Sequence, residues 1–179
     1  MKKIIAILFA GLFALVFAAC NNGGTPATTT SSPTQPTPGT DVDPGAREIY
    51  FSPNGVRMEM GAAPAPVLEA LGEPKVTLEC PSCALNAKDV DYTYPGFKLT
   101  VTYPEQGDDY ITSIKLSDDT YTTPGGVTIG STFEEVTAAY GTADKEETGF
   151  YYYIQDKSTL KITITNDQVA QILYEYDFD

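Results

Sequence analysis

The sequence predicts an α+β domain in which a short helix followed by an antiparallel β-meander occurs twice. Three observations support this. A glycine-bounded helical pattern recurs at one constant spacing; its matching pairs are Gly61 and Gly130, Val67 and Val136, Ala70 and Ala139, and Gly72 and Gly141. The segments after each helix alternate between apolar and polar residues, as strands with one buried face do. Turn-forming residues separate these segments. We place the first repeat at about 47–119 and the second at about 120–179.

The later helix has the clearer start and stop signals. Ser131 and Glu134 have the spacing of a capping box, in which each side chain accepts a hydrogen bond from the other residue's backbone N–H. Val136 and Tyr140 fall on one helical face, and Gly141 supplies the left-handed conformation that commonly ends a helix. Because so short a helix is marginal alone, we expect the packing of its apolar face to stabilise it.

The earlier helix, within 61–72, lacks this capping box. Ala62 and Ala65 stand at the two corresponding positions. Pro64 and Pro66 fall in the first turn instead, where a missing backbone N–H matters little.

Residues 1–19 have the pattern of a secretory signal peptide. Lys2 and Lys3 precede an uncharged apolar run that ends in Ala-Ala. A run shorter than the ~20 residues that span a bilayer argues against a permanent transmembrane helix. An uncleaved anchor and an ordinary secreted protein are the alternative interpretations.

The cysteine that follows this run resembles the lipobox cysteine of bacterial lipoproteins, although Phe17 stands where an aliphatic residue is usual. The resemblance implies cleavage before Cys20 and diacylation of its thiol. The lipid would then anchor the chain to the cell membrane on its extracytoplasmic face.

The segment 20–46 is predicted to be a linker, because threonine, proline and serine dominate it and no apolar period is present. The folded part is then 47–179, enough for one domain with its own core. The chain carries 24 acidic and 11 basic residues, a formal net charge of −13. Such a charge repels nucleic acid, which we exclude as a partner.

The remaining segments predict antiparallel strands. Asn54-Gly55 is a hairpin signal, and Phe97, Leu99 and Val101 alternate with polar residues. The expected strands are 47–51, 56–60, 76–79, 91–94, 97–103, 110–116, 150–154, 159–165 and 169–176.

The stretch Gly126-Val-Thr-Ile-Gly-Ser-Thr-Phe-Glu-Glu-Val136, the later Tyr140-Gly141 and the strands that follow resemble the β-lactamase-inhibitor-protein-like fold. That fold includes small outer-membrane assembly lipoproteins of the SmpA/OmlA type. Gly72-Glu-Pro, Pro81-Ser-Cys-Ala84 and Tyr92-Thr-Tyr-Pro-Gly-Phe97 further resemble a group of uncharacterised bacterial lipoproteins with a doubled layout. The resemblance covers about 47–179. It implies non-catalytic binding of another protein through the open face of a sheet, and it carries over no contact residue.

Cys80 and Cys83 form a C-x-x-C motif, which can be a redox couple, half of a zinc site or a structural disulfide. Zinc needs two more ligands, but the chain has no histidine and its third cysteine is the lipidated one. A redox thiol usually lies at a helix N-terminus, and the surrounding pattern is not thioredoxin-like. In an exported protein we expect a disulfide, with a thiol-disulfide protein as the alternative.

Other catalytic constellations are weak. Triads of the serine-hydrolase type fail for want of histidine. Three acidic pairs, Asp108-Asp109, Asp118-Asp119 and Glu146-Glu147, fall in or beside expected turns and indicate solvated surface. No calcium-loop spacing is present. We therefore predict a protein that is not an enzyme and needs no metal or cofactor.

Tyrosines crowd two equivalent strands, and tyrosine is enriched at protein interfaces. Alternation sends some of these side chains to the face away from the helices. The interface candidates are Tyr92, Tyr94, Tyr151 and Tyr153. Core packing is the competing interpretation of the same residues.

The sequence thus predicts a membrane-anchored, extracytoplasmic lipoprotein that acts as a binding module for an unidentified protein of the cell envelope. The alternatives are a thiol-disulfide protein and a binder of a small ligand or wall polymer.

Overall fold

The computed structural model describes residues 47–82 and 87–178, and these lie in one compact unit. The helices are α1 (Pro64–Leu71) and α2 (Phe133–Tyr140). The strands are β1 (Val76–Ser82), β2 (Ala87–Tyr94), β3 (Phe97–Pro104), β4 (Tyr110–Leu116), β5 (Lys145–Glu147), β6 (Phe150–Gln155), β7 (Ser158–Thr165) and β8 (Gln168–Tyr176). The predicted α+β class with antiparallel strands is confirmed.

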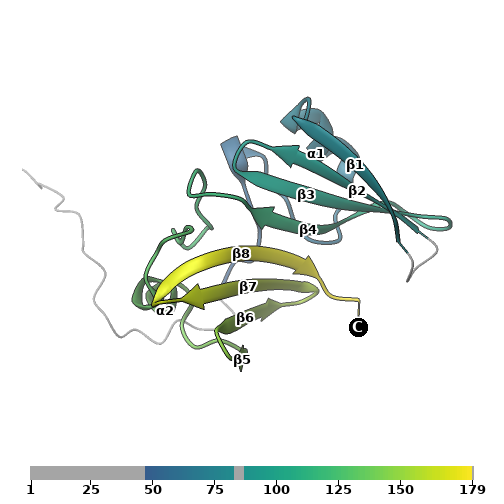
Figure 1. Ribbon diagram of the computed structural model, residues 1–179. Coiled ribbons are helices and arrows are strands. Elements are labelled where there is room, and N and C mark those ends of the chain that lie inside the picture. Colours follow the sequence, from purple (N-terminus) through teal and green to yellow (C-terminus); the bar gives the residue numbers. More distant parts are fainter. Residues whose placement is uncertain (1–46, 83–86, 179) are drawn as a thin grey trace, which may run out of the picture. The chain divides into compact units, whose positions relative to one another are not determined.

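The eight strands form one open antiparallel sheet in the order β1-β2-β3-β4-β8-β7-β6-β5 (Figure 1). The strands that follow α1 and those that follow α2 therefore belong to a single sheet. Their junction is the pairing of β4 with β8, in which Ile114 lies opposite Tyr174. The outer strands of the sheet are β1 and β5.

The strand predictions hold from β1 onward to within a few residues, and β5 was not predicted. The predicted strands 47–51 and 56–60 are wrong, although the chain does turn back between them. Only one isolated bridge, between Phe51 and Met58, joins the two segments, and the connection is a 3₁₀ turn at Pro53–Gly55. The alternating apolar residues of these segments are buried against the sheet rather than paired in a ladder.

Helix α2 begins one residue later than we predicted. Its N-cap is Thr132, whose Oγ1 accepts from the N–H of Glu135, while Glu135 accepts from the N–H of Thr132. Ser131 instead accepts from the N–H of Thr128. Ser131 with Glu134 and Thr132 with Glu135 have the same sequence spacing, so spacing alone does not decide which pair caps the helix. The conformation of the preceding loop decides it.

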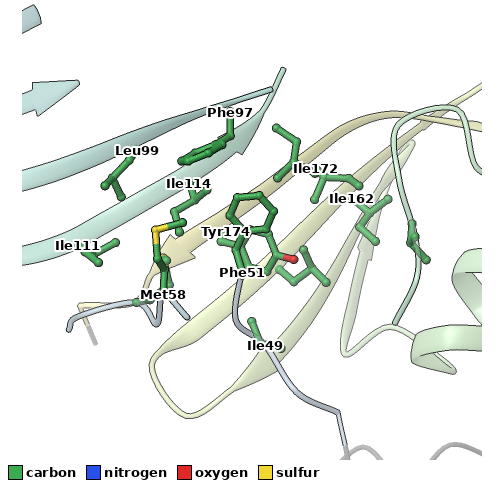
Figure 2. Packing of buried hydrophobic residues seen from close by; sticks show 14 of the residues in the cluster. Ile49, Phe51, Met58, Phe97, Leu99, Ile111, Ile114, Ile162, Ile172 and Tyr174 are labelled. Carbon is green, nitrogen blue, oxygen red and sulfur yellow. The ribbon is translucent and has the colours of Figure 1, made fainter. Parts of the chain in front are cut away.

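The core lies between one face of the sheet and three kinds of cover: the segment 47–62, the loop 117–131 and the two helices. Phe51 is central. Its ring makes edge contacts with Phe97 and Tyr121 at centroid distances of 5.2 and 5.6 Å. Figure 2 shows Phe51 beside Tyr174, with Met58 turned toward Leu99 and Ile111. The segment before α1 thus fills the middle of the core.

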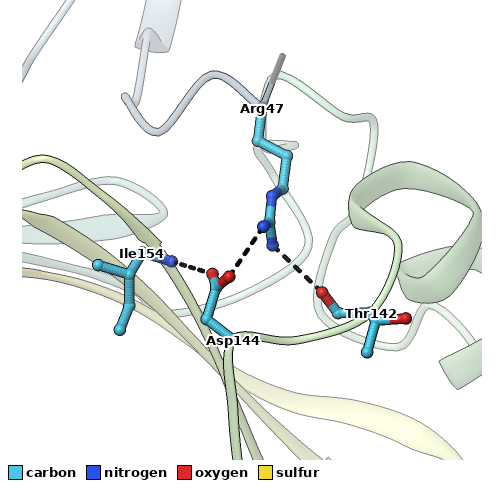
Figure 3. Close-up of polar contacts among 4 residues, drawn as sticks. All are labelled: Arg47, Thr142, Asp144 and Ile154. Atoms are coloured by element: carbon cyan, nitrogen blue, oxygen red, sulfur yellow. Dashed lines mark hydrogen bonds and ion pairs between the residues drawn. The ribbon is translucent and has the colours of Figure 1, made fainter. Parts of the chain in front are cut away.

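Arg47 ties the start of the described part to the loop before β5 (Figure 3). Its Nη2 lies 3.0 Å from Asp144 Oδ1, and its Nη1 donates to the carbonyl of Thr142. Asp144 Oδ2 accepts from the backbone N–H of Ile154 on β6. The ion pair therefore joins the first residues of the domain to the outer strands of its second half.

Candidate functional site

The two faces of the sheet differ in what lies over them. Strand registers place Tyr94, Phe97 and Leu116 on one face, which the helices and loops cover. No helix or loop of the described residues packs in the core cluster from the other side. We call that side the open face; its side chains include Val76, Leu78, Asp89, Asp91, Thr93, Lys98, Thr100, Thr102, Ser113, Lys115, Phe150, Tyr152, Ile154, Thr159, Lys161, Thr163, Leu173 and Glu175.

All four predicted interface tyrosines lie on the covered side. Tyr153 is only 1% exposed and Tyr94 is buried, with its hydroxyl donating to the carbonyl of Gly72 at 3.1 Å. Tyr92 and Tyr151 are half-buried and pack against the core. Because a buried ring contacts no partner, Tyr94 and Tyr153 serve the core, and the candidate interface moves to other residues.

Burial also changes the acidity of these tyrosines. It raises the pKa of Tyr153 to about 12 and that of Tyr174 well above its ordinary value. Burial, together with a 2.8 Å hydrogen bond between the hydroxyls of Tyr92 and Tyr103, raises the pKa of Tyr103. The covered side is therefore an aromatic layer in which burial raises the pKa of Tyr103, Tyr153 and Tyr174 and so disfavours their ionisation.

Tyr152 is the tyrosine that the prediction passed over. It pairs in register with Lys161 and Lys145, between two inward-facing neighbours, so its ring lies on the open face. The alternation rule could have found it, because three successive tyrosines on one strand must divide between the faces. The sequence pattern left undecided which of the two sets faces inward.

The open face of the first half is polar and internally hydrogen-bonded. Lys98 Nζ and Thr100 Oγ1 donate to the two oxygens of Asp91 at 2.6 and 2.7 Å. Thr102 Oγ1 donates to Asp89 Oδ1 at 2.6 Å. These contacts fix the side chains of β2 and β3, so this part of the face is pre-organised.

Apolar side chains lie on the two flanks of the open face. Val76 and Leu78 on β1 are 56% and 57% exposed, and Ile154 on β6 is 40% exposed. Phe150 and Tyr152 lie on the same face of β6 as Ile154. Neighbouring exposed apolar side chains such as these are candidates for contact with a partner.

Cys80 is exposed on β1, opposite Asp89. It lies within a strand rather than at a helix N-terminus, the position at which reactive thiolates are usually stabilised. Cys83 and the predicted lipidation residue Cys20 lie outside the described residues, so the disulfide and the lipid anchor stay predictions.

A groove of about 640 Å³ lies between the start of α1, the start of β4 and the residues after β8. Three aromatic rings contact one another there, since Tyr110, Tyr176 and Phe178 have centroids 5.1–5.9 Å apart. Asp108 and Asp109 line the same groove. This combination of ring faces and carboxylates is suited to an organic cation.

Within 47–82 and 87–178, no group of three or more histidine, cysteine, aspartate or glutamate side chains is arranged to hold a metal ion. No helix of this part of the chain has the length and apolarity to cross a membrane.

Comparison with family models, with curated proteins and with solved structures found no significant similarity to this chain.

Proposed function

We propose that this protein is a lipid-anchored, non-catalytic module of the cell envelope that binds a protein partner with the open face of its sheet. The observation that carries the proposal is the contrast between the two faces. The described helices and loops pack on one side, while the other presents a pre-organised polar centre between exposed apolar flanks. The predicted signal peptide and Cys20 supply the anchor, and the linker 20–46 supplies the reach.

The proposal includes a doubled architecture of the type that the resemblance to the β-lactamase-inhibitor-protein-like fold implies. Helix α1 precedes β1–β4, and α2 precedes β5–β8. Each helix has eight residues and is followed by a glycine of similar backbone conformation, Gly72 at φ 72° and ψ −157° and Gly141 at φ 70° and ψ −150°. Val67 and Val136 are buried at matching positions. These parallels support a repeat in which β4 and β8 meet in the middle.

Site-specific photo-crosslinking of the full-length chain in its own cells tests the binding face. A photoreactive phenylalanine at Tyr152 or at Thr100 would lie on the open face, and one at Ala138 would lie on the exposed surface of α2. We expect one discrete cross-linked product from the two open-face positions and not from Ala138. Equal products from all three positions, or none from the open face, would contradict the proposal.

The anchor is tested separately. Cys20→Ser should move the protein from the membrane fraction to the soluble exported fraction, because the proposed lipid is attached to that thiol. A Cys80→Ser control should leave the protein at the membrane. Retention of the Cys20→Ser variant at the membrane would overturn the anchor.

The groove at Tyr110, Tyr176 and Phe178 favours a second candidate function, the binding of a small organic cation. Choline is a suitable probe, and its uncharged isostere 3,3-dimethylbutanol is the control. We expect saturable choline binding by the full-length chain that weakens in Asp108→Asn/Asp109→Asn, with little binding of the isostere. Equal binding of both compounds would exclude cation recognition.

A further inference from the structure

The strand registers bring four lysines into one line across the open face. The line runs perpendicular to the strands and takes one residue from each of them. In sheet order these register partners are Val76, Thr93, Lys98, Lys115, Leu173, Lys161, Tyr152 and Lys145. We call Lys98, Lys115, Lys161 and Lys145 the lysine row.

The lysine row is unusual in so acidic a chain. It holds four of the 11 basic residues in a protein with 24 acidic ones. Lys98 and Lys115 also lie directly opposite each other on neighbouring strands, and like charges in that position repel. The arrangement therefore concentrates positive charge against the prevailing charge of the protein.

Two of the four lysines are already paired within the protein. Lys98 contacts Asp91, and Lys145 contacts Glu147 at 2.8 Å. Lys115 and Lys161 have no carboxylate within ion-pair distance in the described part of the chain. Glu175, on the same face in a neighbouring row, forms no ion pair with either of them.

Apolar side chains alternate with these two lysines. Leu173 lies between Lys115 and Lys161, and Tyr152 lies between Lys161 and Lys145. Lys161 Nζ lies 4.9 and 5.4 Å from the ring centroids of Phe150 and Tyr152. Since neighbouring strands are about 4.8 Å apart, the lysine row extends over roughly 24 Å.

We infer that the lysine row binds an acidic segment of the partner protein, which lies across the strands with carboxylates on Lys115 and Lys161. Apolar side chains of the same segment cover Leu173 and Tyr152. This inference rests on the proposed function and names the chemistry of its partner. A phosphate polymer satisfies the lysines equally well, but it leaves the apolar positions of the row uncovered.

The test uses the full-length chain in neutral detergent with two soluble probes. One is a copolymer of glutamate and tyrosine, which has both carboxylates and apolar rings; the other is inorganic polyphosphate, which has charge alone. The informative variants are Lys115→Glu/Lys161→Glu and the milder Lys115→Gln/Lys161→Gln. Lys75→Glu/Lys157→Glu is the matched control, because it changes the net charge equally away from the lysine row. Melting temperatures show that each variant is folded.

We expect the copolymer to bind the unmodified chain and to bind the Lys115→Glu/Lys161→Glu variant at least about tenfold more weakly. The control pair should retain most of the affinity, and Leu173→Ala should weaken copolymer binding without affecting polyphosphate. Added salt should weaken binding of both probes, because Lys115 is exposed and Lys161 is half-buried, so that salt screens their attraction to an anion.

Three outcomes would overturn the inference. Equal weakening by the row pair and the control pair means that only net charge matters. Tighter binding of polyphosphate, with no effect of Leu173→Ala, assigns the row to a phosphate polymer. Failure of both probes to bind excludes an anion site, yet a cross-link from Tyr152 in cells would still support the proposed function. The two proposals therefore fail separately.

Discussion

Arg47 and Asp144 form an ion pair with 3.0 Å between Nη2 and Oδ1, and the Arg47 side chain is only 1% exposed. Two segments distant in sequence, the start of the domain and the entry to β5, are thereby held together. The same carboxylate accepts from the N–H of Ile154 at 2.7 Å. Asp144 thus satisfies a buried cation and a strand backbone at once.

Asp144→Ala should therefore lower the free energy of unfolding by about 2–3 kcal/mol, because it leaves a buried guanidinium with one acceptor fewer and removes the acceptor of the Ile154 N–H. Urea denaturation at neutral pH measures the loss. Arg47→Met removes the buried cation itself. It should therefore lower the free energy of unfolding by less than Asp144→Ala does. A larger loss from Arg47→Met than from Asp144→Ala would contradict this interpretation.

Stability should fall on the alkaline side as buried tyrosines titrate. Below about pH 10, the ordinary tyrosine pKa, the hydroxyls are protonated in both states and their contribution is fully present. Above it the unfolded chain loses protons, while the folded state holds the Tyr153 proton up to a pKa of about 12. The free energy of unfolding should decrease as pH rises through this window, as measured by urea denaturation at a series of pH values.

Tyr153→Phe/Tyr174→Phe should make that alkaline decrease shallower, since burial raises the pKa of both hydroxyls. At neutral pH Tyr174→Phe should be neutral or stabilising, because the Tyr174 hydroxyl is buried without a hydrogen-bond partner in the described structure. An alkaline slope equal to that of the unmodified chain would exclude these tyrosines as its source.

Lys115→Glu should stabilise the fold by about 0.2–1 kcal/mol, because it replaces a like-charge pair with Lys98 by an opposite-charge one. Lys145→Glu in the same row should act in the opposite direction, since it breaks the contact with Glu147. Melting temperatures at low and high salt compare the two variants. Destabilisation by both variants would indicate a response to the net negative charge of the protein rather than to local pairing.

Thr132→Ala should destabilise the protein by about 1 kcal/mol through loss of the α2 cap. Ser131→Ala removes only the acceptor for the Thr128 N–H and should cost less. Parallel urea titrations of the two variants give the comparison. A greater cost at Ser131 would restore the capping box that the sequence first suggests.

Much of the fold follows from local patterns in the sequence. In β3, β4 and β7 the apolar residues mostly alternate with polar ones and are buried on one face, so those strands could be predicted closely. The segment 47–60 shows why alternation alone is insufficient. Ile49, Phe51, Met58 and Met60 are all buried, but they cover the sheet instead of joining it. A segment that is buried on one side and a strand that is paired in a sheet both show alternation of apolar and polar residues.

The candidate site was less predictable, because alternation shows which residues share a face but not which face is inward. The tyrosines of β2 and β6 illustrate this, since Tyr94 and Tyr153 were expected at the interface and are buried. The lysine row could not be predicted from the sequence for another reason. Its members come from four strands, and only the register of the assembled sheet puts them in line.

The pairing of β4 with β8 has a consequence for the order of assembly during synthesis. β4 ends at Leu116, but the strand that covers its second edge begins only at Gln168. While the chain emerges, that edge and Ile114 and Leu116 stay without their final neighbours. Strands β1–β4 therefore stay incomplete until β8 has been synthesised. Nascent chains that stop before β8 should be the most readily digested by protease and the most prone to associate.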